Sequence, residues 1–252
     1  MPKRLSFQLY SARNFQPWDK LLAHLSRCGY AEVEGYGDPA IYGEAAKFRD
    51  LLDANGLTMP TGHVFPLATF ETRRKKVVQI ARTLGMHALY CPYVPPNEQP
   101  QSGAGWKAWG KRLAAVAHEM REEGLAFGWH NHDFEFVKLK DGSFPIEWIF
   151  DGGPLLDWEC DIAWVAFAKQ NPLKWIRSHG ERITAVHLKD NARPGENADQ
   201  HGQTDVGAGT LKWPAIFSAL KNTRTLHHVV EHDNPKDAFR FARNSFRFVS
   251  SM

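Results

Sequence analysis

Two histidines close an apolar run in the middle of the chain. The stretch FGWHNHDFEF covers residues 127–136, and its first half has the composition of a buried strand. Side chains alternate between the two faces of a strand, so His130 and His132 are expected to point the same way. Asp133 and Glu135 follow directly. Ionisable groups at a strand end are costly to bury, so this spacing indicates chemistry, in which one imidazole binds a cation and the other moves a proton.

Polar side chains also end the other strand-like runs of the sequence. They are Glu34; His63; Glu159 and Asp161; His187, Lys189 and Asp190; and Glu231, His232 and Asp233. Each group stands at the C-terminal end of its run, whereas a random scatter of charge would place as many at the N-terminal ends. If the strands run parallel, these side chains converge on one pocket.

Imidazole and carboxylate groups together suit one divalent first-row metal ion such as Mn, Co, Zn or Fe(II). No thiolate belongs to the set, which disfavours a structural zinc cluster. Such an ion would act as a Lewis acid on a hydroxyl and carbonyl pair, and a nearby carboxylate would move a proton. Simpler roles stay open: Glu34 bonded to backbone, His63 facing a loop, Asp161 capping a helix and His187 buried as a core histidine.

The periodicity of the chain predicts the elements that position these groups. Short β-type runs are expected at 4–10, 30–37, 58–65, 88–94, 125–132, 155–161, 183–190 and 226–233. Helical runs are expected at 18–29, 43–56, 70–85, 105–124, 145–153, 171–180, 213–222 and 235–252. Several helical runs end in a glycine before the next strand, which is typical of αβ loops. Eight strands alternating with about eight helices over 252 residues predict a single-domain α/β fold, a (β/α)8 TIM barrel.

A doubly wound open sheet is the alternative fold, but no GxGxxG motif follows the first strand. The loops at 95–105 and 191–209 each follow a predicted strand and are expected at the C-terminal face of the barrel, where active sites form. The glycines of DVGAGTLKW, residues 205–213, would either offer backbone N–H groups to a phosphate or form an ordinary turn before a helix.

The composition excludes several classes of function. The net charge is only +3, and the densest basic cluster, at 73–76, lies in a helical pattern, so no nucleic-acid partner is expected. No apolar run is long enough to span a membrane, and the first 15 residues contain no apolar signal segment. Three widely spaced cysteines favour a reducing compartment. We therefore expect a cytoplasmic protein that acts on small molecules.

Seven motifs together resemble the sugar phosphate isomerase/epimerase family, in the xylose isomerase-like TIM barrel superfamily. They are FQLYSAR (7–13), EVEGYG (32–37), WHNHDFEF (129–136), CDIAWV (160–165), RITAVHLKD (182–190), DVGAGTLKWPAIF (205–217) and VVEHD (229–233). The resemblance spans the chain and implies one divalent metal ion held at the barrel mouth, with a carbohydrate as substrate. It also makes a homo-oligomer possible.

The resemblance implies a ligand set of Glu, Asp, His and Glu from four successive strands. Asp161, His187 and Glu231 match the last three positions, and His130 stands where relatives carry the first Glu. Either His130 replaces that carboxylate as a ligand, or Glu135 reaches back from the loop, or His132 binds instead.

The resemblance also implies the remaining roles and two candidate reactions. Glu231, Lys189 and either His132 or Glu135 are expected to be catalytic. Substrate contacts are expected from Lys189, Glu34, His63 and Trp164, the last standing where epimerases often carry a histidine.

The first candidate reaction is isomerisation or epimerisation of a sugar, sugar phosphate or cyclitol by proton transfer next to a carbonyl. The second is a lyase or hydratase reaction on a keto-sugar or keto-glycoside. DNA repair, as in endonuclease IV, would need ligands for three metal ions, and a decayed sugar-binding barrel would have lost its ligands; both fit this sequence poorly.

Overall fold

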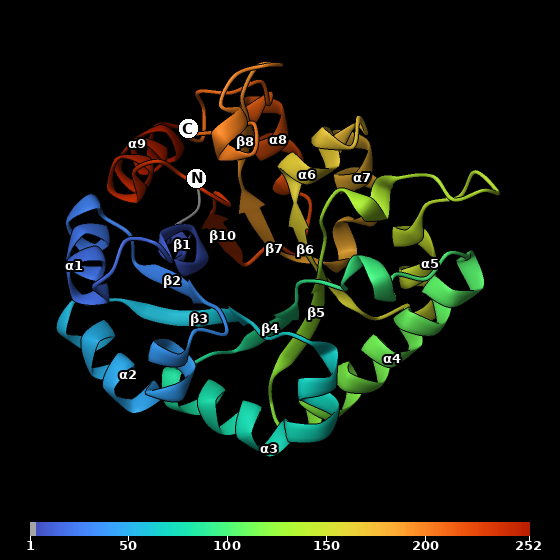
Figure 1. The fold of residues 1–252 in the computed structure, drawn as a ribbon, viewed down its shortest axis with the longest axis horizontal. Helices are drawn as coiled ribbons and strands as arrows, with labels where there is room; N and C mark the ends of the chain where they lie inside the picture. The colour runs from blue at the N-terminus through green and yellow to red at the C-terminus, as the bar shows by residue number, and fades with distance from the viewer. Residues whose placement is uncertain (1–3) are drawn as a thin grey trace.

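The computed structural model describes residues 4–252, in which eight parallel strands close into a barrel (Figure 1). The strands are β1 (Ser6–Gln8), β2 (Glu32–Gly35), β3 (Thr58–His63), β4 (Ala88–Cys91), β5 (Ala126–His130), β6 (Asp157–Asp161), β7 (Ile183–Leu188) and β10 (His227–Val230). Strands β1 to β7 pair with their sequence neighbours, and β10 closes the ring between β7 and β1. The predicted TIM barrel is confirmed, and the open doubly wound sheet is excluded.

Helices surround the barrel on its outside, as Figure 1 shows. They are α1 (Trp18–Cys28), α2 (Ala45–Ala54), α3 (Leu67–Leu84), α4 (Gly103–Glu122), α5 (Pro145–Gly152), α6 (Ile162–Phe167), α7 (Pro172–His179), α8 (Trp213–Leu220) and α9 (Ala238–Ser251). Helices α1 and α3 end at Gly29 and Gly85, whose φ angles of 105° and 80° need a residue without Cβ. The short helix α6 is absent from the predicted set, and Asp161 caps its N-terminus.

Side-chain alternation explains the two environments of the barrel strands. Outward residues such as Phe7, Trp129 and Val186 belong to the main hydrophobic core, which lies between the strands and the helices. A separate small cluster of Ala88, Tyr90 and Ala185 is also buried. The inward positions near the strand ends are left for polar groups.

The strands at both sides of the barrel closure are shorter than predicted. Strand β1 stops at Gln8, because the Gln8 side chain accepts a hydrogen bond from the backbone N–H of Tyr10 and the chain turns into a 3-10 helix, Leu9–Ala12. Strand β10 ends at Val230. Lys189, Glu231 and Asp233 therefore lie just beyond the strand ends, on the loops that cover the barrel mouth.

The loop after β7 contains an unpredicted pair of short strands. Strand β8 (Asp190–Asn191) pairs antiparallel with β9 (Gln203–Thr204). Within residues 4–252, no helix is long and apolar enough to cross a bilayer. The prediction that the first 15 residues contain no apolar signal segment includes residues 1–3, which lie outside the described part of the chain.

Candidate metal centre and active site

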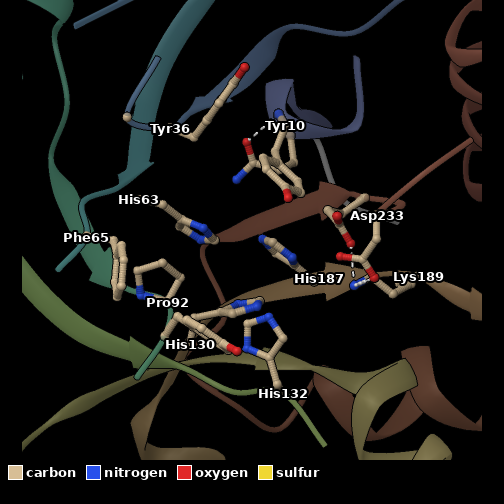
Figure 2. Close-up of a pocket in the computed structure, with 14 residues that line it drawn as sticks. Tyr10, Tyr36, His63, Phe65, Pro92, His130, His132, His187, Lys189 and Asp233 are labelled. Carbon is tan, nitrogen blue, oxygen red and sulfur yellow. Dashed lines mark hydrogen bonds and ion pairs between the residues drawn. The ribbon is translucent and has the colours of Figure 1, made fainter. Parts of the chain in front are cut away.

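A cavity of about 410 Å³ opens at the C-terminal ends of the barrel strands (Figure 2). Its lining includes polar side chains from most of the strands and a set of aromatic rings. The lining residues are Gln8, Tyr10, Tyr36, Gly37, His63, Phe65, Pro92, Tyr93, His130, His132, His187, Lys189, Glu231 and Asp233. Loops and strand ends that are distant in sequence thus meet at one mouth of the barrel, as the polar strand ends predicted.

Three of the predicted metal ligands form one group. One donor atom from each of Asp161, His187 and Glu231 lies within 4.8 Å of the other two, and all three residues are buried. Asp161 Oδ2 and Glu231 Oε2 have the ammonium of Lys189 as their close partner, and His187 Nδ1 has no hydrogen-bond partner among the described residues. Buried polar atoms are normally satisfied, so an unpartnered imidazole nitrogen beside two carboxylate oxygens that share one ammonium fits a bound cation.

Lys189 lies against the same group and sets its charge. Its Nζ is 3.1 Å from Asp161 Oδ2, 2.6 Å from Glu231 Oε2 and 3.1 Å from Asp233 Oδ2. Figure 2 shows the Lys189–Asp233 contact at the edge of the cavity. Three ionised carboxylates beside one ammonium leave a net charge of −2, which a divalent cation would neutralise. The donor types and the charge both fit the predicted metal.

The hydrogen bond at the other ring nitrogen of His187 orients it as a ligand. His187 Nε2 lies 2.7 Å from Glu34 Oε1, which also accepts from Gln8 Nε2 at 2.8 Å. Because an ionised carboxylate only accepts, Nε2 carries a proton, which leaves Nδ1, 3.8 Å from Asp161 Oδ2, as the nitrogen available to a metal ion. Against the effect of burial, the carboxylates of Glu159 and Glu34 raise the pKa of His187 well above its ordinary value, so a bound ion would displace the proton on Nδ1. Metal-binding histidines commonly have such a carboxylate partner. Glu34 is fully buried and serves as this partner.

His130 lies in a second group of side chains. Its Nδ1 is 3.0 Å from Glu159 Oε2, and His63 Nε2 is 2.5 Å from the same oxygen. His63, His130, Glu159 and His187 bring donor atoms within 4.8 Å of one another, whereas His130 is not in the group with Asp161 and Glu231. The geometry therefore places His130 beside the predicted first ligand set and not within it.

The prediction that His130 and His132 share a face is confirmed, since both line the cavity and their ring centroids are 5.2 Å apart. His132 packs against Tyr93 and Trp164, with centroid distances of 5.3 and 5.7 Å. Burial and the positive charge of Lys189 lower the pKa of His132 to about 3, so its ring is neutral at pH 7 and can accept a proton.

Glu135 does not reach the cavity, contrary to the expectation that it swings back as a base or ligand. The 3-10 turn Phe134–Phe136 directs its carboxylate behind the strand. There Oε1 accepts from Trp129 Nε1 at 2.8 Å and Oε2 accepts from the backbone N–H of His132 at 2.9 Å. Burial raises the pKa of Glu135 to about 8, and these two donors oppose the shift. Its contacts give it a role in holding the turn.

Trp164 is not among the cavity-lining residues but contacts two of them. Lys189 Nζ lies 4.7 Å from the centroid of its ring, a cation–π contact, and His132 packs on the ring as described. The backbone N–H of Trp164 donates to Asp161 Oδ1 at 3.0 Å. Asp161 thus caps the helix with Oδ1 and turns Oδ2 toward Lys189 and His187, so the two sequence interpretations of this residue are compatible.

Burial and charge shift the pKa values of the acidic groups in opposite directions. Burial raises the pKa of Asp161, and that of Glu231 to about 7, although Lys189 opposes both shifts. Asp233 is also buried, but the ammonium of Lys189 and the amide of Gln203 keep its pKa below the ordinary value.

The glycine-rich loop does not offer its amides to a ligand. The backbone N–H groups of Gly207 and Gly209 donate to Asp190 Oδ2 at 3.0 and 3.2 Å, and Leu211 donates to Asp190 Oδ1. Trp213 Nε1 adds a fourth bond at 2.7 Å. The possible phosphate cradle is thus filled by the protein's own carboxylate.

Several cavity residues were missed in the sequence. Gln8, Tyr10 and Tyr36 line the cavity but lie in motifs that showed a family resemblance without an assigned role. Asp233 was noted only as a polar strand end. Glu159 was also noted but not counted as a ligand, although its position two residues before Asp161 puts it on the same inward face. That spacing was the signal that could have identified it.

Comparison with known proteins places this arrangement in a family. A family model described as a xylose isomerase-like TIM barrel matches residues 22–249. The chain belongs to the xylose isomerase-like TIM barrel family. The predicted resemblance is thereby confirmed.

Individual proteins similar to this chain are distant from it in sequence. The rhizopine catabolism protein MocC of Rhizobium meliloti is 24% identical over an alignment that covers 82% of this chain and 71% of MocC. A sugar phosphate isomerase/epimerase from Parabacteroides distasonis superposes with a TM-score of 0.83 at 20% identity, covering 100% of this chain and 94% of that one. The probable 3-DHS dehydratase AsbF from Bacillus anthracis gives a TM-score of 0.77 at 10% identity, with 98% of each chain covered. At these identities the structural likeness supports the fold, and the residues of the site must support the reaction.

Proposed function

We propose that this protein is a divalent-metal-dependent isomerase or epimerase that acts on an unphosphorylated sugar or cyclitol. The observation that carries the proposal is the buried group of donor atoms on Asp161, His187 and Glu231, within 4.8 Å of one another, beside a cavity of sugar-binding size. When bound there, a divalent ion would supply Lewis-acid polarisation of a substrate carbonyl. The Parabacteroides distasonis isomerase/epimerase, which shares the fold, supports this class of reaction.

Two groups that can move protons line the cavity from different strands. Glu231 follows β10, and His132 follows β5. Epimerisation needs one group to remove a proton from carbon and a second to return one, and a carboxylate and a neutral imidazole can do both. Lys189, held between Asp161 and Glu231, is positioned to donate to an oxygen that gains negative charge.

The charges of the cavity favour a neutral substrate over a sugar phosphate. Among the described lining residues, Lys189 is the one lysine or arginine, and three carboxylates already surround it. The amides of the glycine-rich loop are held by Asp190, as described above. The guanidinium of Arg13 donates to the backbone carbonyls of Tyr10 and Asp233. A dianionic phosphate would therefore find no lysine or arginine free of carboxylate or carbonyl partners among these residues.

The rim of the cavity provides apolar faces for such a substrate. Tyr10, Tyr36, Phe65 and Tyr93 line it, and Figure 2 shows the rings of Tyr10, Tyr36 and Phe65 around the histidines. The rings of Tyr10 and Tyr36 pack edge to face with centroids 5.4 Å apart, and those of Phe65 and Tyr93 are tilted with centroids 5.9 Å apart. Aromatic faces of this kind suit the C–H faces of a sugar ring.

A lyase or dehydratase reaction on a keto-sugar is the second candidate. It is favoured by the histidine at position 130, where a two-carboxylate epimerase would carry Glu, and by the fold shared with the 3-DHS dehydratase AsbF. A neutral His132 could then serve as the one base, with loss of a hydroxyl group as water.

Incubation of the metal-loaded protein with neutral sugars, cyclitols and their phosphates in D2O tests the proposal. We expect one deuterium at carbon, without loss of water, for a neutral substrate. A mass decrease by one water would instead support the lyase reaction.

The variants Asp161→Asn and Glu231→Gln should lose this exchange together with the metal ion of this group. The matched variant Glu32→Gln alters another buried barrel glutamate, which pairs with Arg4, and should keep both. Full metal content in the double variant Asp161→Asn, Glu231→Gln would refute the ligand assignment, and a preference for phosphorylated sugars would refute the substrate class.

A further inference from the structure

We propose that His63, His130 and Glu159 form a second divalent-cation site, separate from the group of Asp161, His187 and Glu231. Its ion would be of the first-row class that binds imidazole and carboxylate together, such as Zn²⁺, Co²⁺ or Fe²⁺. The inference requires neither the proposed reaction nor an ion at the first group.

The donor atoms of this second site already converge on one point. His63 Nε2 and His130 Nδ1 lie 2.5 and 3.0 Å from Glu159 Oε2. The three side chains come from β3, β5 and β6, and Figure 2 shows the rings of His63 and His130 close together beside the cavity. Two ligand atoms about 2.1 Å from one metal ion are about 3.0–3.4 Å apart. The observed separations need only a small outward shift of His63 to admit an ion.

Hydrogen bonding alone leaves this group unsatisfied. Glu159 and Glu34 are both 0% exposed, and Glu159 Oε1 and Glu34 Oε2 have no hydrogen-bond partner among residues 4–252. Ring nitrogens of three histidines crowd around Glu159 Oε2, with His187 Nε2 at 3.5 Å. A site built for hydrogen bonds would use both oxygens of a buried carboxylate.

The charge of the group also calls for a cation. Within the described chain, neither Glu34 nor Glu159 is paired with a lysine or arginine; their charged partners are the imidazoles of His63, His130 and His187. Two fully buried carboxylates that have only imidazoles as charged partners carry a negative charge that is strongly unfavourable without further compensation. One divalent ion would neutralise it, and two imidazoles with one carboxylate leave positions open to the cavity that His63 and His130 line.

His187 lies between the two groups and faces carboxylates of both. Its Nε2 faces Glu34 and Glu159, whereas its Nδ1 faces Asp161. Two bound ions would therefore share no carboxylate, and each group can be emptied without removing a ligand from the other.

Co²⁺ titration of the metal-free full-length protein tests the second site, because visible absorption reports the coordination of Co²⁺ without any activity. Bound metal would be counted in parallel by elemental analysis after removal of free ions. We compare the unchanged protein with Glu159→Gln and His63→Ala for the second group, Glu231→Gln for the first, and Glu32→Gln as a matched buried-glutamate control. Circular dichroism melting confirms that each variant folds.

We expect about two Co²⁺ per chain in the unchanged protein and the control, and about one in either Glu159→Gln or His63→Ala. The ion lost in Glu231→Gln should have a different absorption spectrum. A single ion lost in Glu159→Gln but kept in Glu231→Gln would support this site and refute the first group as the metal centre. Unchanged metal content in folded Glu159→Gln and His63→Ala would overturn the inference, whatever happens to Glu231→Gln.

Discussion

Replacing Lys189 by methionine separates the electrostatic role of this side chain from its packing role. Methionine keeps an unbranched apolar stem in a position that is 2% exposed, but it removes the ammonium within 2.6–3.1 Å of Asp161, Glu231 and Asp233. The three carboxylates would then lack a fixed cation.

The size of the effect follows from that geometry. Breaking a buried ion pair from one side costs about 3–5 kcal/mol, so Lys189→Met should lower the free energy of unfolding of the metal-free protein by about that amount. In a protein of this size the loss corresponds to a decrease in melting temperature of about 6–20 °C.

Although Lys189→Met should be less stable than the unchanged protein, we expect it to bind the metal ion more tightly. Lys189 contacts the same oxygens, Asp161 Oδ2 and Glu231 Oε2, that the ion would use. Without this competing cation, the variant should bind Mn²⁺ or Zn²⁺ at least about tenfold more tightly, a gain of about 1.4 kcal/mol. An excess of about 100 Kd of metal would stabilise either protein by about 2.7 kcal/mol.

Urea unfolding with chelator and with excess metal measures both effects, and calorimetric titration gives the affinity. Lys107→Met is the matched control, because Lys107 pairs with Asp151 on the surface at 2.7 Å. It should change stability by less than about 1 kcal/mol and leave metal binding unaltered. Equal or weaker metal affinity in Lys189→Met would refute the view that the ammonium and the metal use the same carboxylate oxygens.

Three further predictions concern stability. Glu135→Gln should lower the free energy of unfolding by about 1–3 kcal/mol in urea, because an amide N–H₂ would face the N–H of either Trp129 or His132; an unchanged midpoint would contradict the assigned bonds. Asp190→Asn should cost about 1.5–3 kcal/mol and speed proteolysis of the 191–212 loop, because the carboxylate accepts four N–H bonds; equal cleavage rates would count against this anchor. Burial among aromatic rings, followed by the charge of Arg182, lowers the pKa of His179 below its ordinary value. The unfolded chain therefore takes up the proton first, and this stability is full above about pH 6.5 and is lost as the pH falls below it. His179→Gln should flatten that part of the stability–pH curve, and an identical curve would exclude His179 as its source.

The local sequence was sufficient to predict the barrel fold and to predict that the site lies at the C-terminal ends of the strands. Period-2 apolar runs, helical runs and glycine caps such as Gly29 and Gly85 are set by residues close together in the chain, so the eight strands and their polar C-terminal ends could be predicted. Strand alternation also determined that His130 and His132 share a face.

The tertiary structure alone decided which polar groups meet. Closure of the barrel brings Glu34 to His187, 153 residues away, and His63 to Glu159, 96 residues away. The turn after β5 directs Glu135 toward Trp129 and away from the cavity. Contacts of this kind depend on strand register and on where each strand ends, because a side chain one residue beyond a strand no longer follows its alternation. The sequence by itself therefore determined the donor types and their common end of the barrel, whereas their partition into two groups on either side of His187 arises only from the packing of distant strands.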